Sequence, residues 1–179
     1  MDVDIGGLVQ PRIEPEVQVH FARTPPVTHD EHAILDAIDW ISLGFEIVHC
    51  PFADWNFMAA DAIAAHGVHG LLVVGPKVPV EDIPGCRDKL RSFTIDLHRD
   101  GQPVASGRGA NVLDSPLLAI AHLISVLADQ PRFAPLQAGE VVTTGTLTEL
   151  FPAVVGETWN CEISGIELLP TSMHLVAET

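Results

Sequence analysis

Three glutamates near the start of the chain have the residue type and spacing of a metal site. Glu14 and Glu16 lie two positions apart in an extended stretch, and Glu46 lies in a second, strand-like apolar run. On a strand, residues i and i+2 project from the same face, so Glu14 and Glu16 point to one place with Cα atoms about 7 Å apart. Clustered carboxylates resist ionisation unless a cation compensates them, and a hard divalent ion such as Mg²⁺ prefers oxygen ligands.

The same pair of glutamates has a simpler interpretation. One face of an antiparallel sheet is often solvated, so Glu14 and Glu16 alone are also typical of the wet face of a strand. Glu46 favours the metal site, because it adds a third carboxylate from another apolar, strand-like run.

The apolar residues recur with periods of two and of three to four, which favours a mixed structure with more strand than helix. The expected strands cover residues 17–22, 45–48, 70–75, 92–98, 139–147 and 158–163, and a last hairpin arm lies within 166–176. The expected helices cover residues 28–41, 57–66 and 115–128. The turn at Arg99-Asp100-Gly101 predicts a hairpin that begins with the strand at 92–98.

Two of the expected helices carry start signals. Thr28 is the expected N-cap of the first, with Glu31 three residues later, and the apolar face of this helix reaches Ile41. Ser115-Pro116 places a proline in the first turn of the last helix. The side chains of that helix that we expect to face inward are Leu117, Ile120, Ala121, Ile124 and Leu127.

Five segments along the chain form a recognisable series. They are Gln10-Pro11-Arg12-Ile13-Glu14-Pro15-Glu16, Gly44-Phe45-Glu46-Ile47-Val48, Asp54-Trp55 with 57–64, 106–117, and Ala138-Gly139-Glu140-Val141-Val142-Thr143-Thr144-Gly145-Thr146-Leu147. In sequence, spacing and order they resemble the fumarylacetoacetate hydrolase superfamily, and within it the branch of 2-keto-4-pentenoate hydratases and 4-oxalocrotonate decarboxylases. The resemblance runs from about Leu8 to about Val176.

The resemblance implies an α+β, strand-rich fold, a fumarylacetoacetase C-terminal-like mixed β-sandwich or β-roll with flanking helices, formed as a single domain by residues 1–179. It also implies that Glu14, Glu16 and Glu46 hold Mg²⁺ or Mn²⁺ and leave part of the octahedral shell to water and substrate. A 2-oxo acid chelates such an ion through its keto oxygen and its carboxylate. The segment Thr144-Gly145-Thr146 is similar to one that lies near the substrate carboxylate; a strand end with a bulge glycine is the alternative interpretation.

Two departures from the family pattern concern the chemistry. The full-length enzymes begin with an N-terminal segment that carries a catalytic lysine, and this chain starts just before the Glu-x-Glu strand, so we expect impaired catalysis. The hydratases tend to read Ala-Asp-Asn-Ala where this chain reads Ala64-Ala65-His66-Gly67. His66, and His49 three residues after Glu46, are therefore candidate catalytic residues for proton transfer, although surface histidines are the simpler interpretation.

The other reactive side chains favour structural roles. Cys50, Cys86 and Cys161 are odd in number and widely spaced, so we expect buried free thiols. Lys77, which could stand in for the family's lysine, is expected to lie in an exposed loop. Arg108 is expected to hold a turn rather than an anion.

The composition limits the partners and the location. A net charge of −15 disfavours nucleic acid and anionic membranes, because phosphate binding needs clustered Lys and Arg, and only nine are scattered here. An anionic substrate would therefore need a local cation. No apolar run approaches the roughly eighteen residues of a membrane span, and the N-terminus lacks the basic start and apolar core of a signal peptide, so we expect a cytoplasmic protein.

The expected function is that of a divalent-metal-dependent hydro-lyase. It would add water to a 2-hydroxy-2,4-dienoate or 2-keto-4-pentenoate in aromatic-compound catabolism, with a small 2-oxo or 2-hydroxy-dienoic acid as its substrate. Decarboxylation of a 2-oxo-enedioate such as 4-oxalocrotonate is an alternative that uses the same metal, and a truncated, inactive homologue acting as a partner subunit is another. Relatives commonly pair their catalytic domains, so we expect a homo-oligomer or association with a paralogous subunit.

Overall fold

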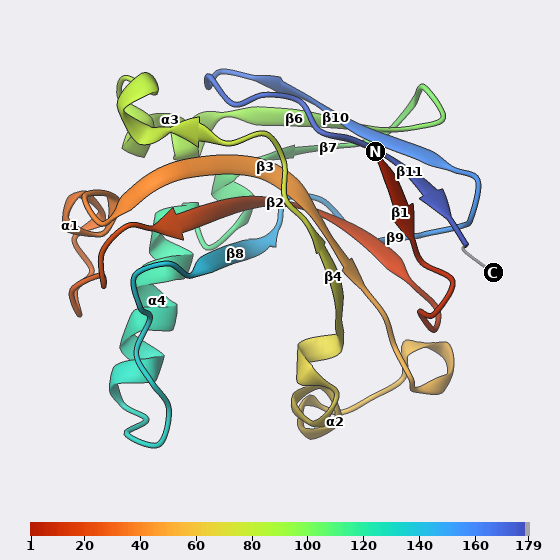
Figure 1. The fold of residues 1–179 in the computed structure, drawn as a ribbon, viewed down its shortest axis with the longest axis horizontal. Coiled ribbons are helices and arrows are strands. Elements are labelled where there is room, and N and C mark those ends of the chain that lie inside the picture. The colour runs from red at the N-terminus through yellow and green to blue at the C-terminus, as the bar shows by residue number, and fades with distance from the viewer. Residues whose placement is uncertain (178–179) are drawn as a thin grey trace.

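Two β-sheets pack face to face in the computed structural model, which describes residues 1–177 (Figure 1). The five-stranded sheet has the order β1-β11-β10-β6-β7. Its strands are β1 (Asp2–Asp4), β6 (Thr94–Arg99), β7 (Gln102–Arg108), β10 (Thr158–Ser164) and β11 (Ser172–Val176). The six-stranded sheet has the order β4-β3-β2-β8, with β5 paired to β3 and β9 paired to β2. Its strands are β2 (Arg12–Phe21), β3 (Ile38–Val48), β4 (His69–Val73), β5 (Val78–Pro79), β8 (Val141–Thr146) and β9 (Phe151–Pro152).

The core fills the space between the sheets, and β2 shows how the sequence sets its two faces. Ile13, Val17 and Phe21 are apolar, fully buried and part of the core cluster. Successive residues of a strand point to opposite faces, so Glu14 and Glu16 lie on the face of β2 that is turned away from the core. The alternation thus keeps the candidate ligands apart from the side chains that stabilise the fold.

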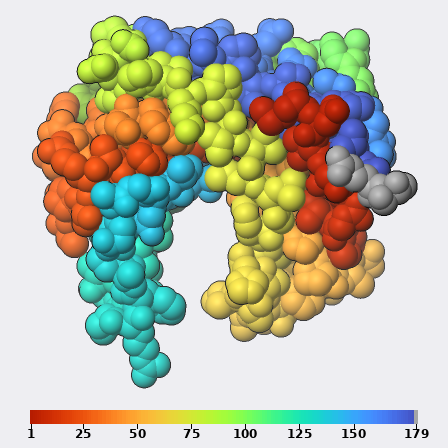
Figure 2. Space-filling model, in the orientation of Figure 1, coloured from red at the N-terminus to blue at the C-terminus, as the bar shows by residue number. Residues whose placement is uncertain are grey.

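The helices of the described residues flank the sheets. They are α1 (Glu31–Leu35), α2 (Ala59–Ala64), α3 (Cys86–Ser92) and α4 (Pro116–Ala128). Figure 1 shows α2 and α4 projecting from the six-stranded sheet on the side opposite to the five-stranded sheet. We call residues 50–68, which include α2, the α2 arm, and residues 116–138 the α4 arm. Figure 2 shows a hollow between the two arms. Glu14 and Glu16 lie on the same side of the six-stranded sheet as the arms, because they are turned away from the core.

The expected strand-rich α+β fold is confirmed, and so are the hairpin and the last helix. β6 and β7 pair as a hairpin, and its turn residues Asp100 and Gly101 have φ angles of 52° and 74°, which are typical of a two-residue hairpin turn. The Ser115 hydroxyl accepts a hydrogen bond of 3.3 Å from the Leu117 N–H and so caps α4. Of the residues expected to face inward, Leu117, Ile120, Ala121 and Ile124 are buried and Leu127 is partly exposed.

The prediction of a helix over residues 28–41 is wrong at both ends. α1 begins at Glu31, after an N-cap at Asp30, and ends at Leu35. The chain from Ile38 onward forms β3, which pairs with β2 over nearly its full length. Capping signals favoured a long helix here, but helix propensity is weak compared with burial against a partner strand. β1 and α3 have no counterpart among the expected elements.

The prediction that no apolar run approaches the length of a membrane span is also wrong. The segment Gly109–Ala128 is long and apolar enough for one, with a mean hydropathy of 1.6. Within it, Leu113 and Asp114 have positive φ angles, and α4 itself has 13 residues. Such a helix is about 20 Å long, whereas a bilayer core is about 30 Å thick. The cysteines agree with expectation, since Cys50, Cys86 and Cys161 are buried and free.

Candidate metal centre

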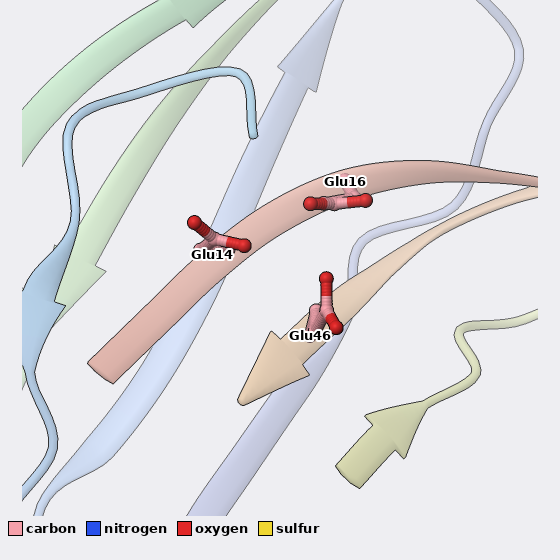
Figure 3. Close-up of side chains that lie close together, drawn as sticks. All are labelled: Glu14, Glu16 and Glu46. Carbon is pink, nitrogen blue, oxygen red and sulfur yellow. The ribbon is translucent and has the colours of Figure 1, made fainter. Parts of the chain in front are cut away.

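The pairing of β2 with β3 brings the three glutamates together. Glu14 lies directly opposite Glu46 in the antiparallel register, and Glu16 lies opposite Gly44. One carboxylate oxygen from each of Glu14, Glu16 and Glu46 lies within 4.8 Å of the others (Figure 3). Two neighbouring strands thus supply three acidic side chains to one point. The shared face of Glu14 and Glu16 is the one that their spacing predicts, and the place of Glu46 is the one that the family resemblance implies.

Gly44 allows the chain at Val73 and the side chain of Gln18 to pack closely against β3 beside this cluster. A Cβ atom at Gly44 would lie 2.2 Å from the carbonyl oxygen of Val73 and 2.3 Å from Nε2 of Gln18, so no larger residue fits. The buried Gln18 amide donates a hydrogen bond of 3.0 Å to that Val73 carbonyl. It also accepts one of 2.9 Å from the hydroxyl of Ser42. These contacts fix the sheet surface next to the glutamates.

Glu16 is the most deeply buried of the three carboxylates, with 1% of its surface exposed. Its Oε2 accepts a hydrogen bond of 2.9 Å from the Gly145 N–H. Burial raises the pKa of Glu16, and the hydrogen bond from Gly145 opposes this effect. Gly145 lies where the β2–β8 register shifts, with a φ of 109°, a bulge conformation that a side chain would strain.

Glu14 shows the electrostatic cost of the cluster. Burial, together with the negative charges of Glu16 and Glu46, raises the pKa of Glu14 to about 8. A bound cation would remove this cost by stabilising the ionised form. Two oxygens on one Mg²⁺, each about 2.1 Å from the ion, lie at most about 4.2 Å apart. Small side-chain rotations would therefore suffice, and the all-oxygen donor set fits a hard divalent cation.

His69 is a neighbour of the cluster that the sequence pattern did not single out. Its Nδ1 lies 2.5 Å from Oε1 of Glu46, where the imidazole N–H donates to the carboxylate. A hydrogen bond of this kind fixes the orientation of a ligating carboxylate. β4 pairs antiparallel with β3 and has a register shift at Val48, and this pairing carries His69 to Glu46. The expected strand at residues 70–75 overlaps β4, but it leaves out His69 and does not predict the register that carries His69 to Glu46.

The other predicted site residues have different contacts. The Nδ1 of His49 accepts a hydrogen bond of 3.5 Å from the Val9 N–H, and His66 is exposed. Thr144 donates its hydroxyl hydrogen bond to the carbonyl of Val17, at 3.1 Å, and Thr146 donates to that of Thr148, at 3.1 Å. Within the segment 144–146, Gly145 is thus the residue whose N–H contacts a candidate metal-ligating side chain, that of Glu16.

Comparisons with known proteins agree with this geometry. A 2-hydroxyhexa-2,4-dienoate hydratase of Comamonas testosteroni is 32% identical over 164 residues, which cover 89% of this chain and 59% of that protein. A 2-keto-4-pentenoate hydratase of Paraburkholderia xenovorans is 33% identical, over 96% of this chain and 62% of that protein. This chain therefore spans about 60% of the length of these relatives.

Solved structures show the same fold. The 4-oxalocrotonate decarboxylase of Pseudomonas putida G7, complexed with magnesium and adipate, superposes with a TM-score of 0.85 at 25% identity, over 97% of this chain and 64% of that one. A second structure of that enzyme, with calcium and acetate, gives 0.81 at 24% identity. The fumarylacetoacetate (FAA) hydrolase C-terminal family matches residues 5–172. The chain belongs to this family.

Proposed function

We propose that residues 1–179 form one domain of a divalent-metal-dependent hydratase that adds water to a 2-hydroxy-2,4-dienoate in aromatic-compound catabolism in the cytoplasm. The observation that carries the proposal is the cluster of Glu14, Glu16 and Glu46, whose oxygens lie within 4.8 Å of one another. The names of the relatives, which are hydratases at 32% and 33% identity, support the reaction. The magnesium or calcium in the neighbouring structures supports a divalent ion.

The three glutamates would hold Mg²⁺ or Mn²⁺. When bound, such an ion supplies Lewis-acid stabilisation to the enolate of a 2-oxo acid. The Gly145 N–H holds one oxygen of Glu16, and His69 holds one oxygen of Glu46. Each contact helps to hold that carboxylate in place. The backbone of segment 144–146 is the proposed neighbour of the substrate, and His49 and His66 remain the proposed proton-transfer residues.

Decarboxylation of a 2-oxo-enedioate is the second candidate function. The observation that favours it is the superposition with a 4-oxalocrotonate decarboxylase, at a TM-score of 0.85 and 25% identity. Either reaction needs the same chelation of a 2-oxo acid at the glutamates. For both, we propose a homo-oligomer or a complex with a paralogous subunit.

The test combines binding and turnover. In the presence of Mg²⁺, the chain should bind oxalate, which mimics an enolate, and chelation with EDTA should abolish this binding. A Glu16→Gln variant should lose it, and Glu162→Gln, an exposed position on β10, should retain it. The decay of 2-hydroxypenta-2,4-dienoate absorbance should require the same metal and the same glutamate. Oxalate binding that is equal with and without metal would contradict the proposal.

A further inference from the structure

Two apolar side chains flank Glu46 on the side of the sheet that carries the glutamates. Leu72 on β4 lies directly opposite Glu46, and such cross-strand pairs have Cβ atoms about 4.5–5.5 Å apart. Val48 is two positions after Glu46 on β3, so it shares the same face. Among the described residues, the core cluster contains Ile47 and packs against Leu71, but it includes neither Val48 nor Leu72. We call Val48 and Leu72 the apolar wall.

A bulge at Gly70 places Leu72 on this side together with His69. In a uniform strand, residues three positions apart point to opposite faces. The register shift between β3 and β4 inserts one extra residue here, so that His69 contacts Glu46 while Leu72 lies opposite it. A Cβ atom at Gly70 would lie 2.6 Å from the carbonyl oxygen of Ile47, so a larger residue does not fit. Bulges re-aim side chains in this way next to active sites.

The chain enters β4 through a strained residue. Val68 has a φ of 60°, which is an outlier for a β-branched residue. Its carbonyl accepts a hydrogen bond of 2.8 Å from the His49 N–H, and its own N–H donates one of 2.9 Å to the carbonyl of Ala65. Strain of this kind persists only where the surrounding contacts enforce it, and it tends to occur at ligand-binding positions. The start of β4, and with it the bulge, is therefore fixed by specific contacts.

The strand order gives the two sides of the glutamate cluster different chemistry. The order β4-β3-β2-β8 places the cluster between β4 and β8. The β8 side presents the backbone N–H of Gly145 and the hydroxyl groups of Thr144 and Thr146. The β4 side presents the apolar wall, in which Val48 is buried and Leu72 is partly exposed. Leu72 thus keeps apolar surface that a ligand can cover.

We infer that Leu72 is a specificity-determining residue, and that the apolar wall binds the uncharged hydrocarbon tail of the substrate. The inference rests on the proposed function, in which the acid end of the substrate lies at the glutamates. It adds an orientation, with the carboxylate toward segment 144–146 and the tail toward β4. Covering the wall with a hydrocarbon removes apolar surface from water, which is favourable. A second carboxylate at the same place would lose hydration without gaining a partner, which is costly. The wall therefore favours the hydratase substrate over a 2-oxo-enedioate.

The experiment compares ligands that share the 2-oxo acid end and differ in the tail. Binding of pyruvate and of 2-oxohexanoate, which has three more methylene groups, is measured by calorimetry with Mg²⁺ and again with EDTA. The parent chain should bind 2-oxohexanoate about tenfold or more tightly, since each methylene group that leaves water contributes about fourfold in affinity. Leu72→Ala should remove most of this gain without weakening pyruvate. Leu169→Ala shortens a half-exposed leucine between β10 and β11 of the other sheet, and it should keep the gain.

A third ligand and a second variant test the polarity of the wall. The dicarboxylate 2-oxohexanedioate has the same six-carbon chain as 2-oxohexanoate, and the parent should bind it more weakly. Leu72→Lys places an ammonium group at the wall and should reverse this order, because the ammonium group pairs with the remote carboxylate. This variant gains a preference, so a folding defect cannot produce the expected result.

Each result decides a separate point. Metal-dependent binding of pyruvate that equals that of 2-oxohexanoate, or a gain that persists in Leu72→Ala, overturns the role of Leu72 and leaves the proposed metal site standing. A Leu72→Lys variant that still prefers 2-oxohexanoate likewise overturns it. If no 2-oxo acid binds in a metal-dependent way, the proposed function fails together with this inference.

Discussion

Both faces of the β2–β3 pair contain buried side chains, but burial has opposite consequences on the two faces. On the core face, Ile13, Val17 and Phe45 are apolar and fully buried, so burial stabilises the fold. On the other face, burial raises the pKa of Glu14 and Glu16, so their ionised forms are unfavourable without a cation. The comparison shows that the apolar face holds in place a polar face that would not be stable alone.

The largest expected effect is on the core face. Phe45→Ala should lower the free energy of unfolding by about 3–5 kcal/mol, because it removes a fully buried aromatic ring and leaves a cavity. Urea denaturation followed by circular dichroism measures this change. A loss below about 1 kcal/mol would mean that the core face does not carry the stability assigned to it.

The carboxyl groups on the polar face should make the free energy of unfolding depend on pH. The pKa of Glu14 is raised from 4.5 to about 8 in the folded protein, so between these values the folded state keeps a proton that the unfolded chain releases. The free energy of unfolding without metal should therefore fall as pH rises from about 5 to about 8, by at most about 1.4 kcal/mol per pH unit for one proton.

Urea denaturation at several pH values in the presence of EDTA tests this slope. Glu14→Gln should flatten it, since the amide does not titrate. Added Mg²⁺ should stabilise the parent more at pH 8 than at pH 5.5, because protons and metal compete for the same oxygens. A parent chain whose metal-free stability increases over this range would contradict the raised pKa of Glu14.

A smaller effect should follow from the hydrogen bond between His69 and Glu46. His69→Leu should weaken Mn²⁺ binding by about 10- to 100-fold, as is typical when a partner of a metal ligand is lost. His69→Asn keeps an N–H near the position of Nδ1 and should stay closer to the parent. Calorimetric titration measures both constants. If His69→Leu binds Mn²⁺ like the parent, His69 does not position Glu46.

Local sequence signals predicted much of the fold and the positions of the three glutamates. Apolar periodicity predicted strands at residues 17–22 and 45–48, and the turn at Asp100-Gly101 predicted a hairpin, because these features depend on neighbouring residues. The first half of β3 could not be predicted this way. Its residues follow strong helix-start signals around Glu31, and only pairing with β2, which is distant in sequence, gives them their structure.

The contacts around the glutamates could not be predicted for the same reason. His69 reaches Glu46 through the register of β4, and Gly145 reaches Glu16 through a bulge in β8. A register shift of one residue would turn the His69 side chain to the opposite face of the sheet, and it would move the Gly145 N–H away from Glu16. The amide of Gln18 likewise joins β2 to a segment distant in sequence, at Val73 and Gly75.

The most direct test of the account is a titration with Mn²⁺, followed by calorimetry and electron paramagnetic resonance, of the parent chain at pH 7.5. One Mn²⁺ per chain should bind, held by Glu14, Glu16 and Glu46. Glu16→Gln should show no measurable binding, and the exposed control Glu162→Gln should bind like the parent. Mn²⁺ that binds equally well to Glu16→Gln, or no binding to the parent, would contradict the three-carboxylate site.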